Sequence, residues 1–527
     1  MSTAPTAGPW WRRAVCYQIY VRSFADSDGD GVGDLAGITS RLPYLAELGV
    51  DAIWLTPFYR SPQADHGYDV ADYRDVDPRF GDLDDFDAML ARAHDLGLRV
   101  IVDVVPNHSS DEHAWFRAAL SAGPGSPQRA RYVFREGRGD QPPNNWQSVF
   151  GGPAWSQVPD GQWYLHLFDT RQPDFDWDNP EVGDEFESVL RFWLDRGVDG
   201  FRVDVAHGMV KQPGLPDLLG PVGGGDLEAA MSDTVRPYFD QPGVHDVYRR
   251  WNRLLAAYPG DRMAIGEAWV VDAAAMARYV RPDEMQQVFN FHWLEAPWSA
   301  AAFRSVIAET YAAVDPVGAT PTWVLSNHDV TRVVTRYGGG GTGRSRARAA
   351  ALAELALPGS AYVYQGEELG LEQVDVPEPA RTDPSWFRGS GPGRDGCRVP
   401  MPWSGASEPY GFSPDGVATW LPMPSDWAGL SVACQSDDPH STLSFYRRAL
   451  AARRELLGAL DDQLDVLDRG EDVLVLSRPG EPGLVCVLNC GAMAVPVGDL
   501  GEPVLTSERG AVIDGRLAPD SGAWFRA

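Results

Sequence analysis

The chain has 527 residues, of which 44% are apolar, 11% aromatic and 23% charged, the composition of a globular protein able to bury a large core. Its formal net charge of −29 repels nucleic acid phosphates and anionic membrane surfaces, so we expect neither as a partner. The charge suits small neutral or cationic ligands, and solubility alone explains it at least as well. The cysteines are odd in number and lack C-x-x-C spacing, which argues against a disulfide framework or a zinc site: Cys16, Cys397, Cys434, Cys486 and Cys490.

Neither a secretory signal nor a membrane-spanning segment is predicted. The opening MSTAPTAGPWWRRAV has no apolar core of the signal-peptide kind, and no apolar run approaches the roughly 18 residues that span a bilayer. We expect a cytoplasmic protein that acts as a monomer or a homodimer.

Eight short apolar runs recur along the chain, and polar or acidic residues follow each. Continuous apolar runs of this kind are typical of strands buried on both faces. Helical patterns lie between them, such as LAGITSRLPYLAELG and LDDFDAMLARAHDLG, each ending at the glycine that favours a helix C-terminus. Strands that alternate with helices predict an α/β fold, a (β/α)8 TIM barrel. The runs are 14–24, 50–59, 98–108, 198–208, 262–270, 285–291, 320–329 and 359–368.

Two segments are too long for simple barrel loops. Residues 107–176, rich in Pro, Gly and Trp, follow the third strand and indicate an inserted subdomain; MVKQPGLPDLLGPVGGGDL follows the fourth strand. After residue 457 the sequence alternates apolar and polar residues with Gly-rich turns, which predicts a small antiparallel β domain. The expected division is 1–106 and 177–457 for the barrel, 107–176 for the insertion and 458–527 for the C-terminal domain.

Two carboxylates, Asp204 and Glu267, end barrel strands in GFRVDV and AIGEAW. Burying a carboxylate among apolar residues is costly unless it is paired or functional. Arg202 lies on the same strand face as Asp204 and could hold it ionised. A structural ion pair explains either carboxylate alone equally well. Two at one barrel face are what a retaining glycosidase needs, one to attack the anomeric carbon and one, kept protonated, to protonate the leaving oxygen.

Two histidines also end predicted strands. His108 closes PNH, and His328 closes the seventh strand with Asp329 directly after it. Such groups can hydrogen-bond sugar hydroxyls, although a lone histidine is more often structural.

The acidic stretch DSDGDGVGD, residues 26–34, resembles the first half of an EF-hand loop. Its carboxylates and the turn glycine Gly31 stand at the positions of such a loop, but its twelfth position is Gly37 instead of Glu, and a predicted strand precedes it. A calcium sensor is therefore excluded, while a polar turn and a structural ion site both remain open. The candidate ligands are Asp26, Asp28, Asp30, Val32 and Asp34.

Taken together, the motifs resemble the α-amylase superfamily, glycoside hydrolase family 13, in its α-glucosidase and oligo-1,6-glucosidase branch. The similarity extends from AVCYQIYVRSF to the C-terminal β domain. GFRVDVAHG and GRDGCRVPMPW look most like actinobacterial α-glucosidases. The motifs that carry the resemblance are YQIYVRSFADSDGDGVGDLAGI, DHGYDVADY, DVVPNH, GFRVDVAHG, GEAW, SNHD and GRDGCRVPMPW.

The resemblance implies Asp204 as nucleophile, Glu267 as general acid/base and Asp329 as the third carboxylate. It implies that the acidic loop holds a structural Ca²⁺ or Mg²⁺, and it implies no organic cofactor. One arginine of GRDGCR should reach the terminal glucose, and the sequence does not distinguish Arg394 from Arg398. A core role is as plausible as a pocket role for the two phenylalanines. The residues implied in the glucose pocket are Asp65, Tyr68, His108, Arg202, His328, Arg394 or Arg398, Phe150 and Phe168.

Two departures from the sequence pattern of this branch leave open whether α-1,4 or α-1,6 glycosidic linkages are preferred. QPDFDWDNP stands where oligo-1,6-glucosidase-like members have Leu-Asn after QPD, and Val205 occurs in members of either linkage preference. The resemblance favours an exo-acting α-glucosidase that releases α-glucose from maltose-like substrates with some transglucosylation. The alternatives are an oligo-1,6-glucosidase and a glucosyltransferase or isomerase such as trehalose synthase or sucrose isomerase. A non-catalytic transporter-associated relative is disfavoured, because those lose the carboxylates and carry a membrane helix.

Overall fold

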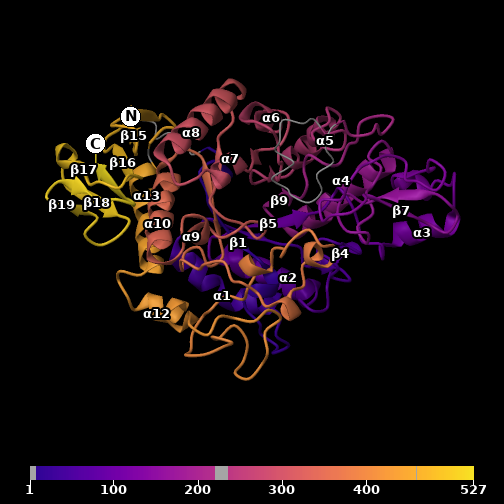
Figure 1. Ribbon diagram of the computed structural model, residues 1–527, viewed down its shortest axis with the longest axis horizontal. Helices are drawn as coiled ribbons and strands as arrows, with labels where there is room; N and C mark the ends of the chain where they lie inside the picture. The colour runs from indigo at the N-terminus through magenta and orange to yellow at the C-terminus, as the bar shows by residue number, and fades with distance from the viewer. Residues whose placement is uncertain (1–7, 220–235, 459, 527) are drawn as a thin grey trace.

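The computed structural model describes residues 8–219, 236–458 and 460–526. A central barrel carries the inserted segment on one side and the C-terminal sheet on the opposite side (Figure 1). The predicted fold class is confirmed.

All eight barrel strands form where the apolar runs predict them, and every pair of hydrogen-bonded neighbours is parallel. The sheet order is β11-β10-β9-β5-β2-β1-β13-β12, so that β11 and β12 meet at an incompletely closed seam. The strands are β1 (Val15–Ile19), β2 (Ala52–Leu55), β5 (Arg99–Val104), β9 (Gly200–Val203), β10 (Met263–Gly266), β11 (Gln287–Val288), β12 (Thr322–Val324) and β13 (Ser360–Tyr364).

A helix follows each strand and covers the outside of the barrel. The eight are α1 (Leu35–Leu48), α2 (Leu83–Asp95), α4 (Pro180–Arg196), α5 (Val244–Ala256), α6 (Ala273–Arg278), α8 (Ala300–Val314), α10 (Gly340–Ala356) and α13 (Thr442–Leu457). Shorter helices α7 (Phe291–Glu295), α9 (Val333–Arg336), α11 (Pro384–Phe387) and α12 (Val432–Ser436) lie in the connections.

Local sequence sets the ends of these helices. The Asp34 carboxylate accepts the Gly37 N–H (2.6 Å) at the start of α1, and Gly49 ends that helix in the left-handed region at φ 96°. Helix α4 begins with Asn179 as cap and Pro180 at its first position, and ends at Gly197.

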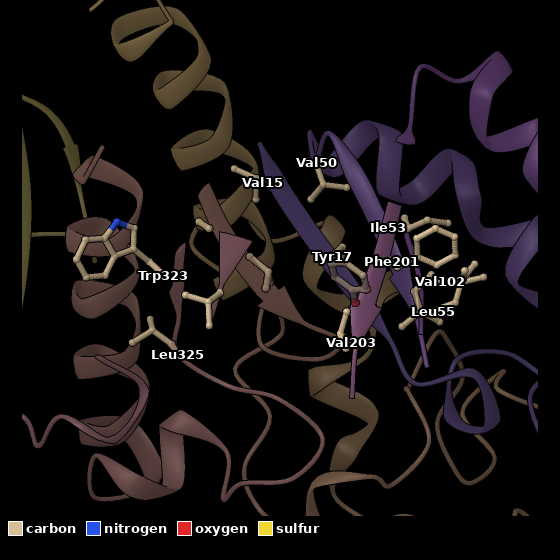
Figure 2. Packing of buried hydrophobic residues seen from close by; sticks show 14 of the residues in the cluster. Val15, Tyr17, Val50, Ile53, Leu55, Val102, Phe201, Val203, Trp323 and Leu325 are labelled. Carbon is tan, nitrogen blue, oxygen red and sulfur yellow. The ribbon is translucent and has the colours of Figure 1, made fainter. Parts of the chain in front are cut away.

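The core separates into two layers because successive strand residues point to opposite faces. Tyr17, Ile53 and Phe201 pack outward under the helices, within the cluster of Figure 2. Cys16 and Trp54, one residue away from them, belong instead to the cluster that fills the barrel interior. The barrel is therefore a packed core, and an open site can form only at its ends.

The insertion between β5 and α4 contains α3 (Ala114–Ala122) and a small antiparallel sheet. That sheet consists of β6 (Phe134–Arg135), β8 (Trp163–Leu165) and β7 (Trp155–Gln157). A two-stranded ribbon, β3 (Tyr59–Arg60) and β4 (Asp72–Val76), precedes α2. The second expected insertion, after β9, lies partly outside the described residues.

The C-terminal region forms the predicted antiparallel β structure, with sheet orders β14-β15-β16-β21-β18 and β17-β20-β19. Its strands are β14 (Asp465–Asp468), β15 (Val473–Arg478), β16 (Leu484–Asn489), β17 (Val495–Pro496), β18 (Pro503–Thr506), β19 (Val512–Ile513), β20 (Arg516–Leu517) and β21 (Ser521–Arg526). Among the described residues, no helix has the length and apolar character needed to cross a membrane.

Candidate active site

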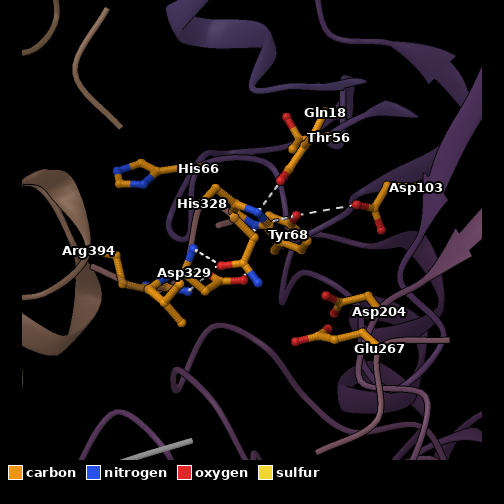
Figure 3. A network of polar contacts seen from close by, with 12 residues as sticks. Gln18, Thr56, His66, Tyr68, Asp103, Asp204, Glu267, His328, Asp329 and Arg394 are labelled. Carbon is orange, nitrogen blue, oxygen red and sulfur yellow. Dashed lines mark hydrogen bonds and ion pairs between the residues drawn. The ribbon is translucent and has the colours of Figure 1, made fainter. Parts of the chain in front are cut away.

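Four carboxylates from different strands meet at the carboxyl end of the barrel. Asp103 lies on β5, Asp204 directly follows β9, Glu267 directly follows β10, and Asp329 comes shortly after β12. Parallel strands end at the same face, so Asp204, Glu267 and Asp329 face one cavity although they span more than 100 positions of sequence, and Asp103 is buried beside them (Figure 3).

The guanidinium of Arg202 joins three of these carboxylates. Its Nη1 donates to Asp103 Oδ1 (2.9 Å) and Asp204 Oδ1 (2.7 Å), and its Nη2 donates to Glu267 Oε2 (2.6 Å). Figure 3 shows the side chains of Asp204 and Glu267 lying next to each other. One buried cation therefore fixes both residues that the sequence singled out.

Three carboxylates surround the single guanidinium of Arg202, and this excess of negative charge affects the protonation of Asp204. Burial raises the pKa of Asp204 well above its usual value; the charges of Glu267, Asp103 and Asp329 raise it further, and Arg202 opposes them. The excess of negative charge around Arg202 therefore favours retention of a proton within this carboxylate cluster.

Glu267 is oriented by two further donors. Trp269 Nε1 donates to Oε1 (2.9 Å), and the backbone N–H of Val205 donates to Oε2 (3.1 Å). Val205 has φ 44°, a left-handed conformation that is strained for a β-branched residue. Strain of this kind persists where the surroundings enforce it and is concentrated at functional sites.

Two arginines donate hydrogen bonds to the same carboxylate oxygen of Asp329. Arg394 Nη1 and Arg398 Nη2 each lie 3.0 Å from Asp329 Oδ1. Burial alone would raise the pKa of Asp329, but the positive charges of Arg394, Arg398 and Arg202 outweigh it and hold the pKa below its usual value. Asp329 is therefore ionised, whereas the pKa of Asp204 is raised.

His328 occupies the centre of a hydrogen-bonded chain. Its Nδ1 pairs with the Gln18 amide (2.7 Å), and its Nε2 pairs with the Tyr68 hydroxyl (2.6 Å). The rings of Tyr68 and His328 are stacked at 5.4 Å. Burial lowers the pKa of His328 well below its usual value, so this histidine is neutral.

A second polar chain joins Asp65 to the insertion. Asp65 Oδ1 accepts from Arg394 Nη2 (2.8 Å), and Asp65 Oδ2 accepts from the Gln172 amide (3.1 Å). The same amide lies 3.1 Å from His108 Nε2. Burial raises the pKa of Asp65 to about 7 against the pull of Arg394, and lowers that of His108 to about 3.

These groups enclose an inner cavity of about 30 Å³, the share of one water molecule in the liquid. It adjoins an outer cavity of about 450 Å³ and shares Phe150, Asp329 and Arg394 with it. The inner lining is Asp65, Tyr68, His108, Phe150, Phe168, Asp204, Val205, His207, Glu267, His328, Asp329 and Arg394.

Most residues predicted for the pocket line the inner cavity, and two predicted arginines do not. Phe150 and Phe168, for which the sequence left a core role equally open, both line the inner cavity. Arg394 lines it too, whereas Arg398 is fully buried beside Asp329, and Arg202 is buried beside Asp204 and Glu267.

Sequence reasoning missed three residues. Gln172 belongs to the quoted QPD motif, and His207 belongs to GFRVDVAHG. The His207 ring is 1% exposed, borders the cavity, and has no hydrogen-bond partner within the described residues. Asp383 pairs with Arg394 Nε (2.7 Å) and had no sequence signal, because it lies in a long loop.

Comparison with known proteins decides the family. The model of the α-amylase catalytic domain matches residues 18–461. The chain belongs to the α-amylase family. The matched segment contains Asp103, Asp204, Glu267 and Asp329, together with the insertion between β5 and α4.

Relatives of this α-amylase family member extend over nearly the whole chain. A probable alpha-glucosidase of Rhizobium meliloti (strain 1021) is 39% identical over 91% of this chain and 89% of its own length. An oligo-1,6-glucosidase of Parageobacillus thermoglucosidasius is 37% identical over 85% and 84%. The crystal structure of an alpha-glucosyl transfer enzyme is 38% identical, with a TM-score of 0.89 over 98% of this chain and 99% of that one.

The acidic loop of this α-amylase family chain lies between β1 and α1. Oxygen atoms of Asp26, Asp28 and Asp34 come within 4.8 Å of one another. Asp30 is not one of the three; its carboxylate accepts the Val32 N–H (2.8 Å). Burial and the adjacent carboxylates raise the pKa of Asp28, the electrostatic condition that a cation would relieve.

Proposed function

We propose that the chain is a retaining, exo-acting α-glucosidase. It releases α-glucose from the non-reducing end of maltose-like α-1,4-linked disaccharides and short oligosaccharides, with some transglucosylation. The observation that carries the proposal is the guanidinium of Arg202 shared between Asp204 and Glu267, two carboxylates that line the same cavity. Membership of a family of glycoside hydrolases supports it.

In the first step, a carboxylate oxygen of Asp204 attacks the anomeric carbon and the glycosidic C–O bond breaks. Glu267 transfers its proton to the departing oxygen, which leaves as a hydroxyl. A glucosyl ester on Asp204 results. In the second step, Glu267 takes a proton from water, the water oxygen attacks the anomeric carbon, and Asp204 leaves as a carboxylate. A sugar hydroxyl in place of water gives transglucosylation.

The remaining polar residues fit a terminal glucose unit. Asp329 is ionised and can accept from sugar hydroxyls, while the neutral rings of His108 and His328 complete the cavity lining and hold the Gln172 and Tyr68 side chains by hydrogen bonds. Arg394 connects the two carboxylates Asp65 and Asp329 across the cavity lining. The narrow inner cavity favours one terminal unit over the interior of a chain, which is the reason for an exo-acting enzyme.

The alternatives differ in linkage or in acceptor. An oligo-1,6-glucosidase among the relatives supports cleavage of isomaltose-type substrates. The transfer enzyme of similar fold supports resolution of the glucosyl ester by a second sugar.

The deciding experiment compares kcat/KM for maltose, isomaltose, kojibiose, nigerose and sucrose, with products identified by chromatography. We expect maltose to give the highest value and free α-glucose to be the main product. Faster cleavage of isomaltose would favour the oligo-1,6-glucosidase. An excess of trehalose or isomaltulose over free glucose, from concentrated maltose or sucrose, would overturn the hydrolase assignment.

The acid role of Glu267 has its own test. Glu267→Gln removes the transferable proton, so cleavage of aryl α-glucosides should fall least for the best leaving groups, which need no protonation. The measurement is kcat/KM over a series of phenols of different acidity. Equal losses across the series would mean that Glu267 is not the acid.

We also propose a structural Ca²⁺ or Mg²⁺ in the acidic loop, with Asp26, Asp28 and Asp34 as the residues that would hold it. Hard cations prefer carboxylate oxygens, and no arginine or lysine of the described chain forms an ion pair with these three. The ion would stabilise the loop that begins α1 and take no part in the chemistry. A cytoplasmic location and a monomeric or dimeric state stay predictions.

A further inference from the structure

A second cavity, of about 380 Å³, lies at the end of the barrel opposite the candidate active site. Its walls include Val15 and Arg99, the first residues of β1 and β5, and Gly359, directly before β13. Helix α13 and Arg478 at the end of β15 complete it. The amino ends of barrel strands point away from the catalytic face, so this basal cavity is separate from the site already described.

Five arginines line the basal cavity, although the chain as a whole carries a net charge of −29. Three of them form an exposed rim, and each rim arginine has one carboxylate partner. The rim pairs are Arg13 with Asp462 (3.0 Å), Arg99 with Asp199 (3.0 Å) and Arg454 with Asp51 (3.2 Å). Of these three carboxylates, Asp51 and Asp462 also line the cavity.

The other two arginines, Arg453 and Arg478, form a buried floor, with 8% and 2% of their surface exposed. Backbone carbonyls are their only described hydrogen-bond acceptors. Arg453 Nη2 donates to Gly359 O (2.7 Å), and Arg478 Nη1 donates to Ala356 O (3.0 Å). No carboxylate of the described chain lies within ion-pair distance of either, whereas buried charges are normally paired.

A structural role accounts for part of this arrangement. The carbonyls of Leu355 and Ala356 belong to the end of α10, and arginines near a helix C-terminus interact favourably with its dipole. A helix end carries only about half a negative charge. Two buried guanidinium groups therefore exceed what α10 can compensate.

The electrostatics agree with an excess of positive charge. Burial is the main cause that lowers the pKa of Arg453, to about 10, and the positive charge of Arg478 contributes to the shift. Arg453 Nε makes no described hydrogen bond, so the floor keeps a donor for a ligand. An anion at the floor would supply the missing counter-charge.

We propose that the basal cavity binds a phosphate dianion carried by a small organic molecule. The phosphate lies on the guanidinium floor, and the rim arginines close over it, since arginine matches phosphate geometry through paired N–H groups. The cavity volume is within the range of small-molecule sites and exceeds what a bare phosphate fills. The organic part packs on the apolar walls formed by Trp10, Leu357, Pro358, Leu450 and Leu457.

Calorimetric titration of the full chain at fixed ionic strength tests the proposal, with ribose 5-phosphate, inorganic phosphate and ribose as probes. Ribose 5-phosphate should bind, inorganic phosphate should bind more weakly, and ribose should not bind. Equal affinity for inorganic phosphate would contradict a contribution of the organic part to binding. Binding of ribose would contradict a requirement for the phosphate group. No heat from ribose 5-phosphate at millimolar concentration would overturn both.

Variants locate the site. Arg13→Gln and Arg454→Gln change exposed side chains, and each should weaken ribose 5-phosphate binding about tenfold, the loss of one charge-assisted contact. Arg469→Gln, which changes an arginine paired with Asp499 outside the cavity lining, is the matched control and should leave the dissociation constant unchanged. Asp204→Asn should also leave it unchanged. Unaltered binding in both rim variants, or loss of binding in Asp204→Asn, would place the anion elsewhere and overturn the proposal.

Discussion

The two ends of the barrel use buried arginines in opposite ways. At the carboxyl end, Arg202 contacts Asp103, Asp204 and Glu267, and Arg394 likewise has three carboxylate partners. At the amino end, Arg453 and Arg478 contact only backbone carbonyls among the described residues. Buried arginines are thus outnumbered by acids at one end, and at the other they have no carboxylate of the described chain within ion-pair distance.

The difference shows how charge imbalance prepares a site for its ligand. An excess of carboxylates over cations favours retention of a proton at the carboxyl end, as the proposed acid catalysis requires, and supplies oxygen atoms that can accept hydrogen bonds. An excess of cations at the basal end favours an anion. The predictions below test the two halves of this comparison.

The largest expected effect is on catalysis at the carboxyl end. Asp204→Ala removes the proposed nucleophile and should lower kcat on maltose by roughly 10⁴-fold or more, the scale seen when a member of a catalytic unit is deleted. Circular dichroism and thermal unfolding should show an intact fold, because the lost group is a carboxylate at a cavity wall. A variant that kept a tenth of wild-type kcat would refute the nucleophile role.

Removal of a buried arginine should lower the free energy of unfolding more at the carboxyl end of the barrel than at the basal cavity. Arg202→Met leaves three buried carboxylates without their cation and should lower the free energy of unfolding by about 3–5 kcal/mol. Arg453→Met removes only hydrogen bonds to carbonyls and should cost about 1–3 kcal/mol. Urea unfolding measures both. Equal losses would mean that the base also contains a charge pair, and the comparison would fail.

Substrate affinity should depend on the ionisation of Asp65. Its pKa is raised to about 7, so as the pH rises through 7 the group loses its proton and becomes a better acceptor for sugar hydroxyls. KM for maltose should therefore fall with rising pH in the wild type. In Asp65→Asn it should be about tenfold higher and independent of pH in this range. An unchanged KM profile in the variant would exclude Asp65 from sugar binding.

The smallest expected effect is that of metal removal, because the acidic loop lies outside the chemistry. Chelation by EDTA should lower Tm by about 1 °C, equivalent to the loss of roughly 1 kcal/mol, while kcat changes little. Asp28→Asn is the matched variant, and its Tm should no longer respond to EDTA. A wild-type Tm that ignores both chelation and added Ca²⁺ would argue for a polar turn without an ion.

The barrel was predictable because its strands are buried on both faces. Each must then be a continuous apolar run, and the residue that follows the run must lie at the catalytic face. This rule alone brings Asp204, Glu267 and Asp329 together, though they span more than 100 positions of sequence. The family motifs added the expected roles but were not needed for that convergence.

Contacts between loops were not predictable in this way. Arg394 and Arg398 are four residues apart and look alike in GRDGCR, yet only Arg394 lines the cavity. Asp383 orients Arg394 from a loop without periodicity, and Gln172 joins Asp65 to His108 from the insertion. Such contacts depend on how irregular backbone folds over the barrel, which no local pattern encodes.

By itself, the sequence determined the barrel, the C-terminal sheet and the carboxylates at the strand ends, because burial imposes a pattern on every strand. Only the tertiary structure decided which arginine faces the sugar cavity, and that Arg453 of α13 and Arg478 of β15 form one buried floor. Those outcomes depend on pairing of charges between distant segments, and the electrostatic cost of each charge is set by neighbours that the chain brings near only when it folds.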